Sequence, residues 1–192
     1  MSDKTTKINI CICGDAKVGK SEIIKKYMHK PFTNEYKETN AVDLEKKITE
    51  IGSRIIDMSI WDFPGEERYR SIPNSIYKLL NCYLLVFDVN NMDSFSKLKE
   101  MYKKELLFYI DDKPIILIGN KIDKTKEEIK NLCTENGDIS DYKEEIINWC
   151  TENGNIPYIE TSAKDGTNIN IIFNMAIEKS LLNINDDGFI LI

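Results

Sequence analysis

The sequence predicts an α/β domain of three layers, in which helices cover both faces of a six-stranded, mostly parallel sheet with one antiparallel edge strand. Short apolar runs alternate with amphipathic stretches along the whole chain. Two runs, residues 82–89 and 114–119, are strongly apolar, as strands covered on both faces are. Two others, residues 44–51 and 54–61, are joined at Gly52, a hairpin signal that predicts the antiparallel edge.

The remaining elements follow in chain order. The first strand is a continuous apolar run, and helices are expected where apolar residues recur at intervals of three and four. We expect strands at residues 8–13, 44–51, 54–61, 82–89, 114–119 and 157–160, and helices at residues 21–28, 67–80, 94–110, 143–151 and 168–182. Ligands of such sheets lie outside the carboxyl ends of the strands, so polar residues that follow the strands are the candidates for function.

Length and composition favour one domain, residues 1–192 with a core at about residues 7–182, because 192 residues can bury one hydrophobic core but not two. A net charge of −6 and a pI near 5.0 leave no excess of Lys and Arg for phosphates, so no nucleic-acid partner is expected. No apolar run is long enough to span a membrane. The five cysteines form no CxxC pair, and the CxC at Cys11 and Cys13 lacks zinc-site spacing, so buried, reduced thiols are expected.

A short tandem repeat lies in the second half of the chain. Residues 126–139 read KEEIKNLCTENGDI and residues 143–156 read KEEIINWCTENGNI, so that 11 of 14 positions are identical at a spacing of 17. One duplication is too short for a solenoid. Each copy is typical of a helix ended by Gly137 or Gly154 in the left-handed cap position. Trp149 predicts that the second copy is the helix docked on the sheet, while the first is a surface addition, either a neutral insertion or a partner-binding surface.

Residues 14–21, GDAKVGKS, fit the pattern GxxxxGK[ST] between a predicted strand and a predicted helix. Successive backbone N–H groups in such a loop wrap phosphates, and its glycines let the backbone come close. Lys20 would pair with the β- and γ-phosphates of a nucleotide, and the Ser21 hydroxyl would bind Mg²⁺. The candidate phosphate-binding residues are Asp15, Ala16, Lys17, Val18, Gly19, Lys20, Ser21 and Glu22.

An NKxD motif, Asn120, Lys121 and Asp123, follows the apolar strand that ends at Gly119. The Asp123 carboxylate can accept hydrogen bonds from N1–H and from the N2 amino group of guanine. Adenine offers neither donor there and would leave a desolvated carboxylate unpaired. The motif therefore favours guanine and separates this chain from a rival class, the ATP-dependent P-loop enzymes.

Residues 61–66, WDFPGE, close the second hairpin strand. Asp62 is placed to hold Mg²⁺ through water, and the Gly65 N–H could reach a γ-phosphate. A DxPG run by itself is a common turn, and its neighbours favour the metal-site interpretation.

Three longer segments match a known family. TNAVDL at residues 39–44 is similar to the Rab segment TIGVDF, and WDFPGEERYRSI at residues 61–72 is similar to WDTAGQERYRSI. ETSAK at residues 160–164 matches the family's loop of the same sequence. Residues 7–182 therefore resemble a G domain of the Ras superfamily, and the Rab branch within it. The resemblance implies a P-loop G domain, a small GTPase that binds GTP and GDP with Mg²⁺ and converts GTP to GDP and phosphate.

The same matching implies roles for further residues. Thr39 would bind Mg²⁺ only when GTP is bound, Phe32 would pack edgewise on the base, and Tyr36 would cover the phosphates. The ETSAK loop would flank the guanine with Ser162, the Ala163 N–H and the Lys164 stem. The implied catalytic residues are Lys20, Gly65 and Glu66, and the implied metal ligands are Ser21, Thr39 and Asp62.

The catalytic positions depart from the family pattern. Glu66 stands where the family has glutamine, and an ionised carboxylate can only accept hydrogen bonds and repels the γ-phosphate. Ala16 replaces the usual Gly or Ser, and Pro64 stiffens the start of switch II where the family has Ala. These changes predict binding with slow hydrolysis; the alternative is that Glu66 is a harmless surface substitution.

The C-terminal sequence departs as well. Rab proteins usually end in one or two cysteines that receive prenyl groups, whereas the last cysteine here is Cys150 and residues 185–192 read NDDGFILI. Two interpretations stay open: a longer tail beyond Ile192, or a protein without a lipid of its own.

The sequence thus predicts a molecular switch in vesicle or membrane traffic that acts through switch segments at residues 35–43 and 62–76. The implied partners are effectors, exchange factors and GTPase-activating proteins. We expect a monomer in the cytoplasm or at the cytosolic face of intracellular membranes, attached by a tail or by a partner. The alternative function is a nucleotide-locked, hydrolysis-deficient GTP-binding interaction module.

Overall fold

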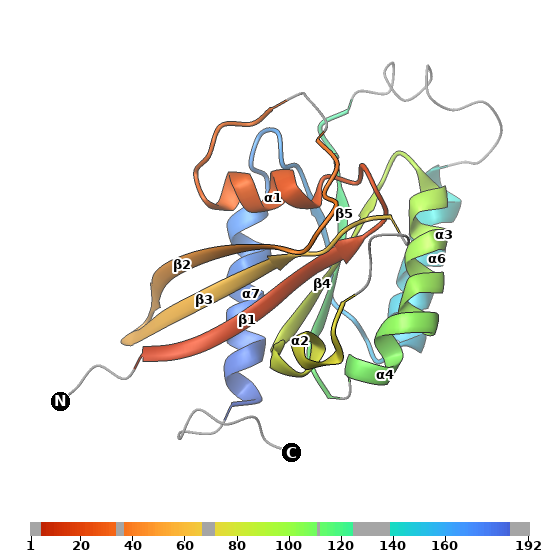
Figure 1. Ribbon diagram of the computed structural model, residues 1–192. Coiled ribbons are helices and arrows are strands. Elements are labelled where there is room, and N and C mark those ends of the chain that lie inside the picture. Colours follow the sequence, from red (N-terminus) through yellow and green to blue (C-terminus); the bar gives the residue numbers. More distant parts are fainter. Residues whose placement is uncertain (1–4, 34–36, 67–71, 111, 125–138, 185–192) are drawn as a thin grey trace.

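The computed structural model describes residues 5–33, 37–66, 72–110, 112–124 and 139–184 (Figure 1). For residues 139–141 it describes the backbone only. The strands are β1 (Thr5–Gly14), β2 (Asp43–Ile51), β3 (Arg54–Asp62), β4 (Cys82–Asp88), β5 (Ile115–Asn120) and β6 (Tyr158–Thr161). They form one sheet in the order β2-β3-β1-β4-β5-β6. Every pairing is parallel except that of the edge strand β2 with β3. The predicted sheet is therefore confirmed.

Helices cover both faces of the sheet. They are α1 (Lys20–Tyr27), α2 (Asn74–Leu79), α3 (Met92–Met101), α4 (Leu107–Ile110), α6 (Ile139–Glu152) and α7 (Ile169–Leu182), with a π-helical turn, η2 (Tyr102–Leu106), between α3 and α4. α1 and α7 lie on one face, and α2, α3 and α6 lie on the other (Figure 1). Because side chains alternate along a strand, Ile10 and Ile12 of β1 face α1 and α7, whereas Cys11 and Cys13 face the other layer.

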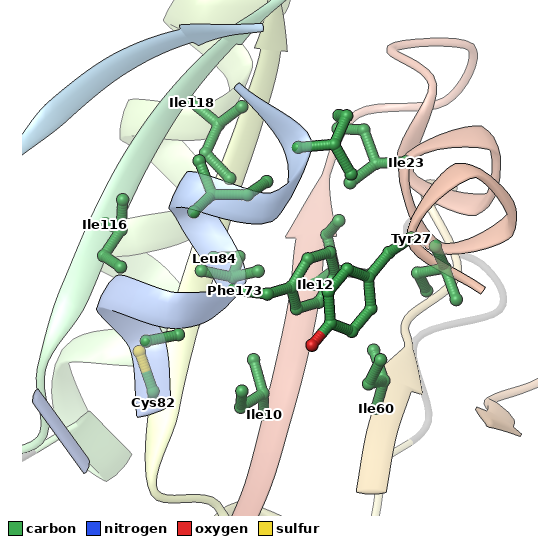
Figure 2. Packing of buried hydrophobic residues seen from close by; sticks show 14 of the residues in the cluster. Ile10, Ile12, Ile23, Tyr27, Ile60, Cys82, Leu84, Ile116, Ile118 and Phe173 are labelled. Carbon is green, nitrogen blue, oxygen red and sulfur yellow. The ribbon is translucent and has the colours of Figure 1, made fainter. Parts of the chain in front are cut away.

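The layer beneath α1 holds the last turn of that helix against the sheet. Tyr27 of α1 stacks on Phe173 of α7 with ring centroids 3.9 Å apart, beside the β1 side chain Ile12 (Figure 2). All three residues are almost completely buried. Burial of such apolar side chains contributes roughly 2 kcal/mol each. α1 is therefore packed on this face of the sheet, and the loop at residues 14–21 joins its start to the carboxyl end of β1.

The second copy of the repeat is the docked helix that Trp149 predicts. Trp149 of α6 is buried and meets the rings of Phe95 and Tyr102 edge-on, at 5.8 and 5.3 Å. Gly154, with φ +92°, takes the left-handed conformation expected after the helix. Residues 125–138, which hold nearly all of the first copy, lie outside the described residues.

Two helix predictions need correction. The helix expected at residues 67–80 begins only at Asn74, because Pro73 disfavours a helical conformation in the preceding Ile72; residues 67–71 lie outside the described part. The helix expected at residues 94–110 starts earlier and contains the π turn η2. A π turn holds one residue more than an α turn, and Leu106 in this turn is buried.

The cysteine prediction is confirmed where it can be checked. Four cysteines, Cys11, Cys13, Cys82 and Cys150, are free and buried, and Cys133 lies outside the described residues. Burial raises the pKa of Cys82 to about 12 and that of Cys150 to about 11, which keeps these thiols protonated and unreactive. Among the described residues, no helix is both long enough and apolar enough to cross a membrane.

Candidate functional site

The loops that follow β1, β3, β5 and β6 meet at one edge of the sheet around a cavity of about 390 Å³. This volume lies within the usual range for small-molecule sites. Predicted residues that line it are Ala16, Lys17, Gly19, Lys20, Ser21, Glu22, Phe32, Thr39, Gly65, Asn120, Lys121, Asp123, Ala163 and Lys164. Lys37, which belongs to the predicted switch segment at residues 35–43, lines it too, as do Lys25, Thr33 and Lys124, to which no sequence motif points.

The phosphate-binding loop closes tightly between β1 and α1. A Cβ on Gly14 would lie 2.0 Å from the Val86 carbonyl oxygen, so only glycine fits between β1 and β4 there. Gly19 has φ +97° and occupies the N-cap of α1. The N-terminal end of this helix, with its free backbone N–H groups, borders the cavity. Lys20 is buried, and its Nζ donates to the carbonyl oxygens of Gly14 (3.1 Å) and Asp15 (2.8 Å). This loop is therefore built to receive an anion.

Asn120 joins three loops of the site rather than facing a ligand alone. Its side chain is buried, and Nδ2 donates to the Val18 carbonyl oxygen at 2.9 Å. Its Oδ1 accepts from the Thr161 hydroxyl at 3.1 Å and from the Ala163 N–H at 3.2 Å. Val18 itself is buried in the core, so its predicted role falls to its backbone. Asn120 thus fixes the phosphate loop relative to the loops after β5 and β6.

The candidate base-reading carboxylate is held in place by the ETSAK loop. Ser162 is fully buried behind the cavity, and its hydroxyl donates to Asp123 Oδ1 at 2.7 Å. Lys164 Nζ lies 3.8 Å from Asp123 Oδ2. Asp123 lines the cavity and keeps acceptor capacity for a ligand, since each carboxylate oxygen has two lone pairs. Ser162 therefore positions Asp123, and Lys164 lies on the same side of the cavity.

Asp88 supports the site although it belongs to none of the sequence motifs. This buried carboxylate at the end of β4 lies 2.9 Å from Lys121 Nζ, and its Oδ1 accepts from the Asn90 N–H at 3.0 Å. Lys121 also donates to the Lys17 carbonyl oxygen at 2.6 Å and has a left-handed φ of +72°. A polar residue at the end of the apolar strand β4 was a usable signal, because ligands lie at that edge.

The three predicted metal ligands meet at the opposite end of the cavity. Ser21 Oγ donates to Asp62 Oδ2 at 2.5 Å and lies 3.3 Å from Thr39 Oγ1. Asp62 is buried, and its Oδ1 has no hydrogen-bond partner among the described residues. Burial raises the pKa of the Asp62 carboxyl, against the opposing effects of the Ser21 hydrogen bond and the Lys20 charge.

This donor set fits Mg²⁺. The ion takes oxygen ligands and keeps several waters, so two hydroxyls and one carboxylate acting through water are a suitable protein contribution. An unpartnered carboxylate oxygen in a desolvated position is stabilised by a nearby cation. Bound there, Mg²⁺ would neutralise phosphate charge, while Ser21 and Thr39 would hold it directly and Asp62 through water.

The segment after β3 packs on the phosphate loop. A Cβ on Gly65 would lie 2.5 Å from the Ala16 nitrogen, so the two loops are in contact. Phe63 is buried and meets Tyr77 edge-on at 5.7 Å, and Pro64 is buried as well. Glu66 follows at partial exposure, is not among the residues that line the cavity, and is the last described residue before residue 72.

The remaining predicted residues lie at the margin of the site. Asp15 does not line the cavity, but its Oδ1 accepts from the Ala16 N–H at 2.8 Å and its Oδ2 lies 3.2 Å from Lys97 of α3. Phe32 lines the cavity and is partly exposed. Tyr36 lies outside the described residues, as do parts of both predicted switch segments.

Comparison with known proteins shows to which family this chain belongs. The family model described as "Ras family" matches residues 9–182. This chain belongs to the Ras family. It is 33% identical to Ras-related protein Rab-9B of Homo sapiens over 191 residues, which cover 94% of this chain and 86% of that protein. It is 34% identical to Rab-9A of Homo sapiens with the same coverage, and 35% identical to Rab7 of Cenchrus ciliaris over 195 residues (95% and 86%).

The protein is thus a Rab-like small GTPase of the Ras superfamily. As such it is a GTP-binding switch that binds GTP and GDP with Mg²⁺, hydrolyses GTP, and acts with effector, exchange-factor and GTPase-activating proteins as the family does. The cavity has a carboxylate at one end, a loop with cationic side chains in the middle, and a group of hydroxyl and carboxylate oxygens at the other end.

Proposed function

We propose that this protein is a molecular switch in vesicle or membrane traffic whose own GTP hydrolysis is slow. The guanine end of the cavity supports the binding half of the proposal, because Asp123, Lys121 and Asn120 are each fixed by hydrogen bonds or ion pairs to neighbouring loops. Asp123 would read N1–H and N2 of guanine, with Ala163 and Lys164 beside the base. Phe32 would pack on its edge and Tyr36 would cover the phosphates.

The slow rate follows from Glu66. Hydrolysis requires a group that accepts a hydrogen bond from the attacking water while a second donor stabilises the γ-phosphate oxygens. Glutamine does both, whereas the Glu66 carboxylate can only accept, and its charge opposes the phosphate. Lys20 and the Gly65 N–H would still stabilise the transferring phosphate. We therefore propose that turnover depends on an activating protein that supplies the missing donor.

A second candidate function is a nucleotide-locked module whose hydrolysis is vestigial. The packing of the segment before Glu66 favours it, since Phe63 is anchored in the core and Pro64 is buried next to it. A segment held in this way has less freedom to bring Glu66 over the γ-phosphate. In this function the GTP form would persist and the protein would act as a binding partner.

We further propose a monomeric single domain, residues 1–192, that works in the cytoplasm or at the cytosolic face of intracellular membranes. Attachment to a membrane would come from a partner or from sequence beyond Ile192. The duplicated segment would then be an addition to the domain rather than a second domain, because its second copy forms the docked helix α6.

Single-turnover hydrolysis separates the two functions. The protein is loaded with GTP and Mg²⁺, and phosphate release is followed with and without a cell extract that supplies activating proteins. The switch predicts a slow rate that the extract raises by at least about tenfold, a small part of the range that activating proteins supply. A rate that stays at the same low value in extract favours the nucleotide-locked module.

A further inference from the structure

We propose that Glu22 is a positioning residue that holds Phe32 against the base of a bound guanine nucleotide. The proposal rests on the nucleotide site proposed above, in which Phe32 packs on the edge of the base, and it names the group that keeps Phe32 there. Glu22 acts through Thr33, the residue that follows Phe32. All three residues line the cavity.

The Glu22 carboxylate ties the first turn of α1 to Thr33. Its Oε2 accepts from the Thr33 N–H at 3.3 Å, and its Oε1 accepts from the Thr33 hydroxyl at 3.2 Å. Lys25 Nζ donates to Glu22 Oε1 at 2.6 Å and to the same hydroxyl at 3.3 Å. These three residues, which we call the Glu22 cluster, are thus joined in one hydrogen-bonded group that borders the cavity.

The end of α1 sends the chain back toward the Glu22 cluster. His29 takes a left-handed φ of +57°, and the Lys30 N–H donates to the Lys25 carbonyl oxygen at 2.8 Å. This long hydrogen-bonded turn with a left-handed residue inside it is the Schellman motif that ends many helices. The chain then runs back along α1, so that Thr33 meets Glu22 although 11 positions separate them (Figure 1).

Phe32 depends on this contact because the hydrophobic core does not hold it. Its side chain lines the cavity and is 37% exposed. It belongs to neither of the two clusters of buried apolar residues that the described part of the chain forms. The N–H that Glu22 accepts belongs to the planar peptide group between Phe32 and Thr33. Glu22 therefore fixes the backbone that carries the ring.

The sign of its effect distinguishes this role from two simpler ones. An acidic residue in the first turn stabilises a helix, and so does an i,i+3 pair such as that of Glu22 with Lys25. Neither of these roles requires the two bonds to Thr33. A carboxylate near the phosphates also repels them, so removal of its charge alone would slow nucleotide release. Loss of the hold on Phe32 would instead speed release.

The test measures release of fluorescent GDP from the full chain in excess Mg²⁺, with Glu22→Ala, Phe32→Ala and the double variant. Thr33→Val removes the hydroxyl of the Glu22 cluster without a change in charge. Glu100→Ala is the matched control, because Glu100 pairs with Lys104 at the surface and its loss changes the net charge equally. Thermal unfolding of each variant verifies that the fold is retained.

We expect Glu22→Ala to release GDP about tenfold faster, which corresponds to one lost charge-assisted hydrogen bond. Thr33→Val should release it about threefold faster, as for one neutral hydrogen bond, and Glu100→Ala should match the wild type. Phe32→Ala should release GDP at least about tenfold faster. Adding Glu22→Ala to Phe32→Ala should change the rate by less than about twofold, because residues that act through one another are not additive.

Three results would overturn the proposal: release from Glu22→Ala that is slower than, or within about twofold of, the wild type; an unchanged rate in Phe32→Ala; or a tenfold effect of Glu22→Ala that persists in the Phe32→Ala background. The last result would show that Glu22 acts on the phosphates or on the helix and not through Phe32. Failure of the nucleotide site itself is distinguishable, because the wild type would then not retain GDP at all.

Discussion

The two ends of the nucleotide cavity are built differently. At the base end, Asp123 accepts from Ser162, Lys121 pairs with Asp88, and Asn120 makes three hydrogen bonds, so every predicted base-side group already has a protein partner. At the metal end, Asp62 Oδ1 has no hydrogen-bond partner among the described residues although it is buried.

The difference supports the proposal that the first end reads the ligand and that the second responds to it. A base-reading group must be rigid before binding, because specificity comes from leaving it unpaired with the wrong base. A switch must instead lose contacts when the γ-phosphate leaves. Its polar groups therefore find their missing interaction partners in the metal ion and the phosphate rather than in the protein. We therefore propose that guanine recognition and Mg²⁺ response lie at opposite ends of one cavity.

The largest expected effect breaks the base end. Asp123→Asn removes an acceptor for two donors of guanine, and the new amide can donate to the oxygen at C2 of xanthine. We expect GDP affinity to fall by at least about a hundredfold, from two charge-assisted hydrogen bonds of roughly 1.5–3 kcal/mol each. Xanthosine diphosphate should become the preferred ligand.

Competition binding with the guanine, xanthine and adenine diphosphates measures both changes. Thr167→Ala is a suitable control, because the Thr167 hydroxyl donates to Asp165 on the exposed side of the loop after β6, and Thr167 does not line the cavity. Unchanged GDP affinity in Asp123→Asn would show that another group reads the base.

A smaller effect is expected at the metal end from Glu66→Gln. The amide adds the donor that the carboxylate lacks and removes a negative charge near the γ-phosphate. Stimulated hydrolysis should rise by about tenfold, with GDP affinity unchanged, since Glu66 does not line the cavity and GDP has no γ-phosphate for it to repel. Phosphate release under single-turnover conditions measures it. A wild-type rate equal to that of ordinary Rab proteins with their activators would remove Glu66 as the limitation.

The smallest effect is expected from deletion of residues 126–142, which hold the first copy of the repeat and the first turn of α6 (Ile139–Glu152). The second copy supplies Trp149 and Cys150, which are buried against the sheet layer, so GDP affinity should stay within about twofold of the wild type. Thermal unfolding and GDP release measure the outcome. Collapse of folding or of GDP binding would mean that the first copy belongs to the core, and loss of a cellular partner alone would favour a partner-binding surface.

How much the sequence revealed also differs between the two ends. The motifs around Lys20 and Asp123 are local, because each lies in a loop that follows one strand. Their place at the carboxyl edge of the sheet could therefore be predicted from the sequence alone. The partners that fix them are distant in sequence: Asp88 holds Lys121 and Ser162 holds Asp123 only through the pairing of β4, β5 and β6. No local pattern encodes such contacts.

The elements that were misjudged have physical causes of the same kind. Propensity favoured a helix through Ile72, but Pro73 sets the start of α2 at Asn74. Apolar spacing predicted the helix around Leu106, but it could not distinguish a π turn from an α turn, because tertiary packing decides which residue stays buried. A turn interpretation of DFPG could not foresee that Phe63 is buried in the core.

The contrast between the two ends is tested most directly by the release of fluorescent GDP in excess Mg²⁺ and in excess EDTA, with base preference measured by guanine and xanthine competitors in both. The account predicts that chelation speeds release by at least about tenfold, since one ion neutralises both the phosphates and the buried Asp62. It also predicts that the preference for guanine over xanthine stays the same without the metal. A release rate that EDTA does not change, or a base preference that disappears together with Mg²⁺, would contradict it.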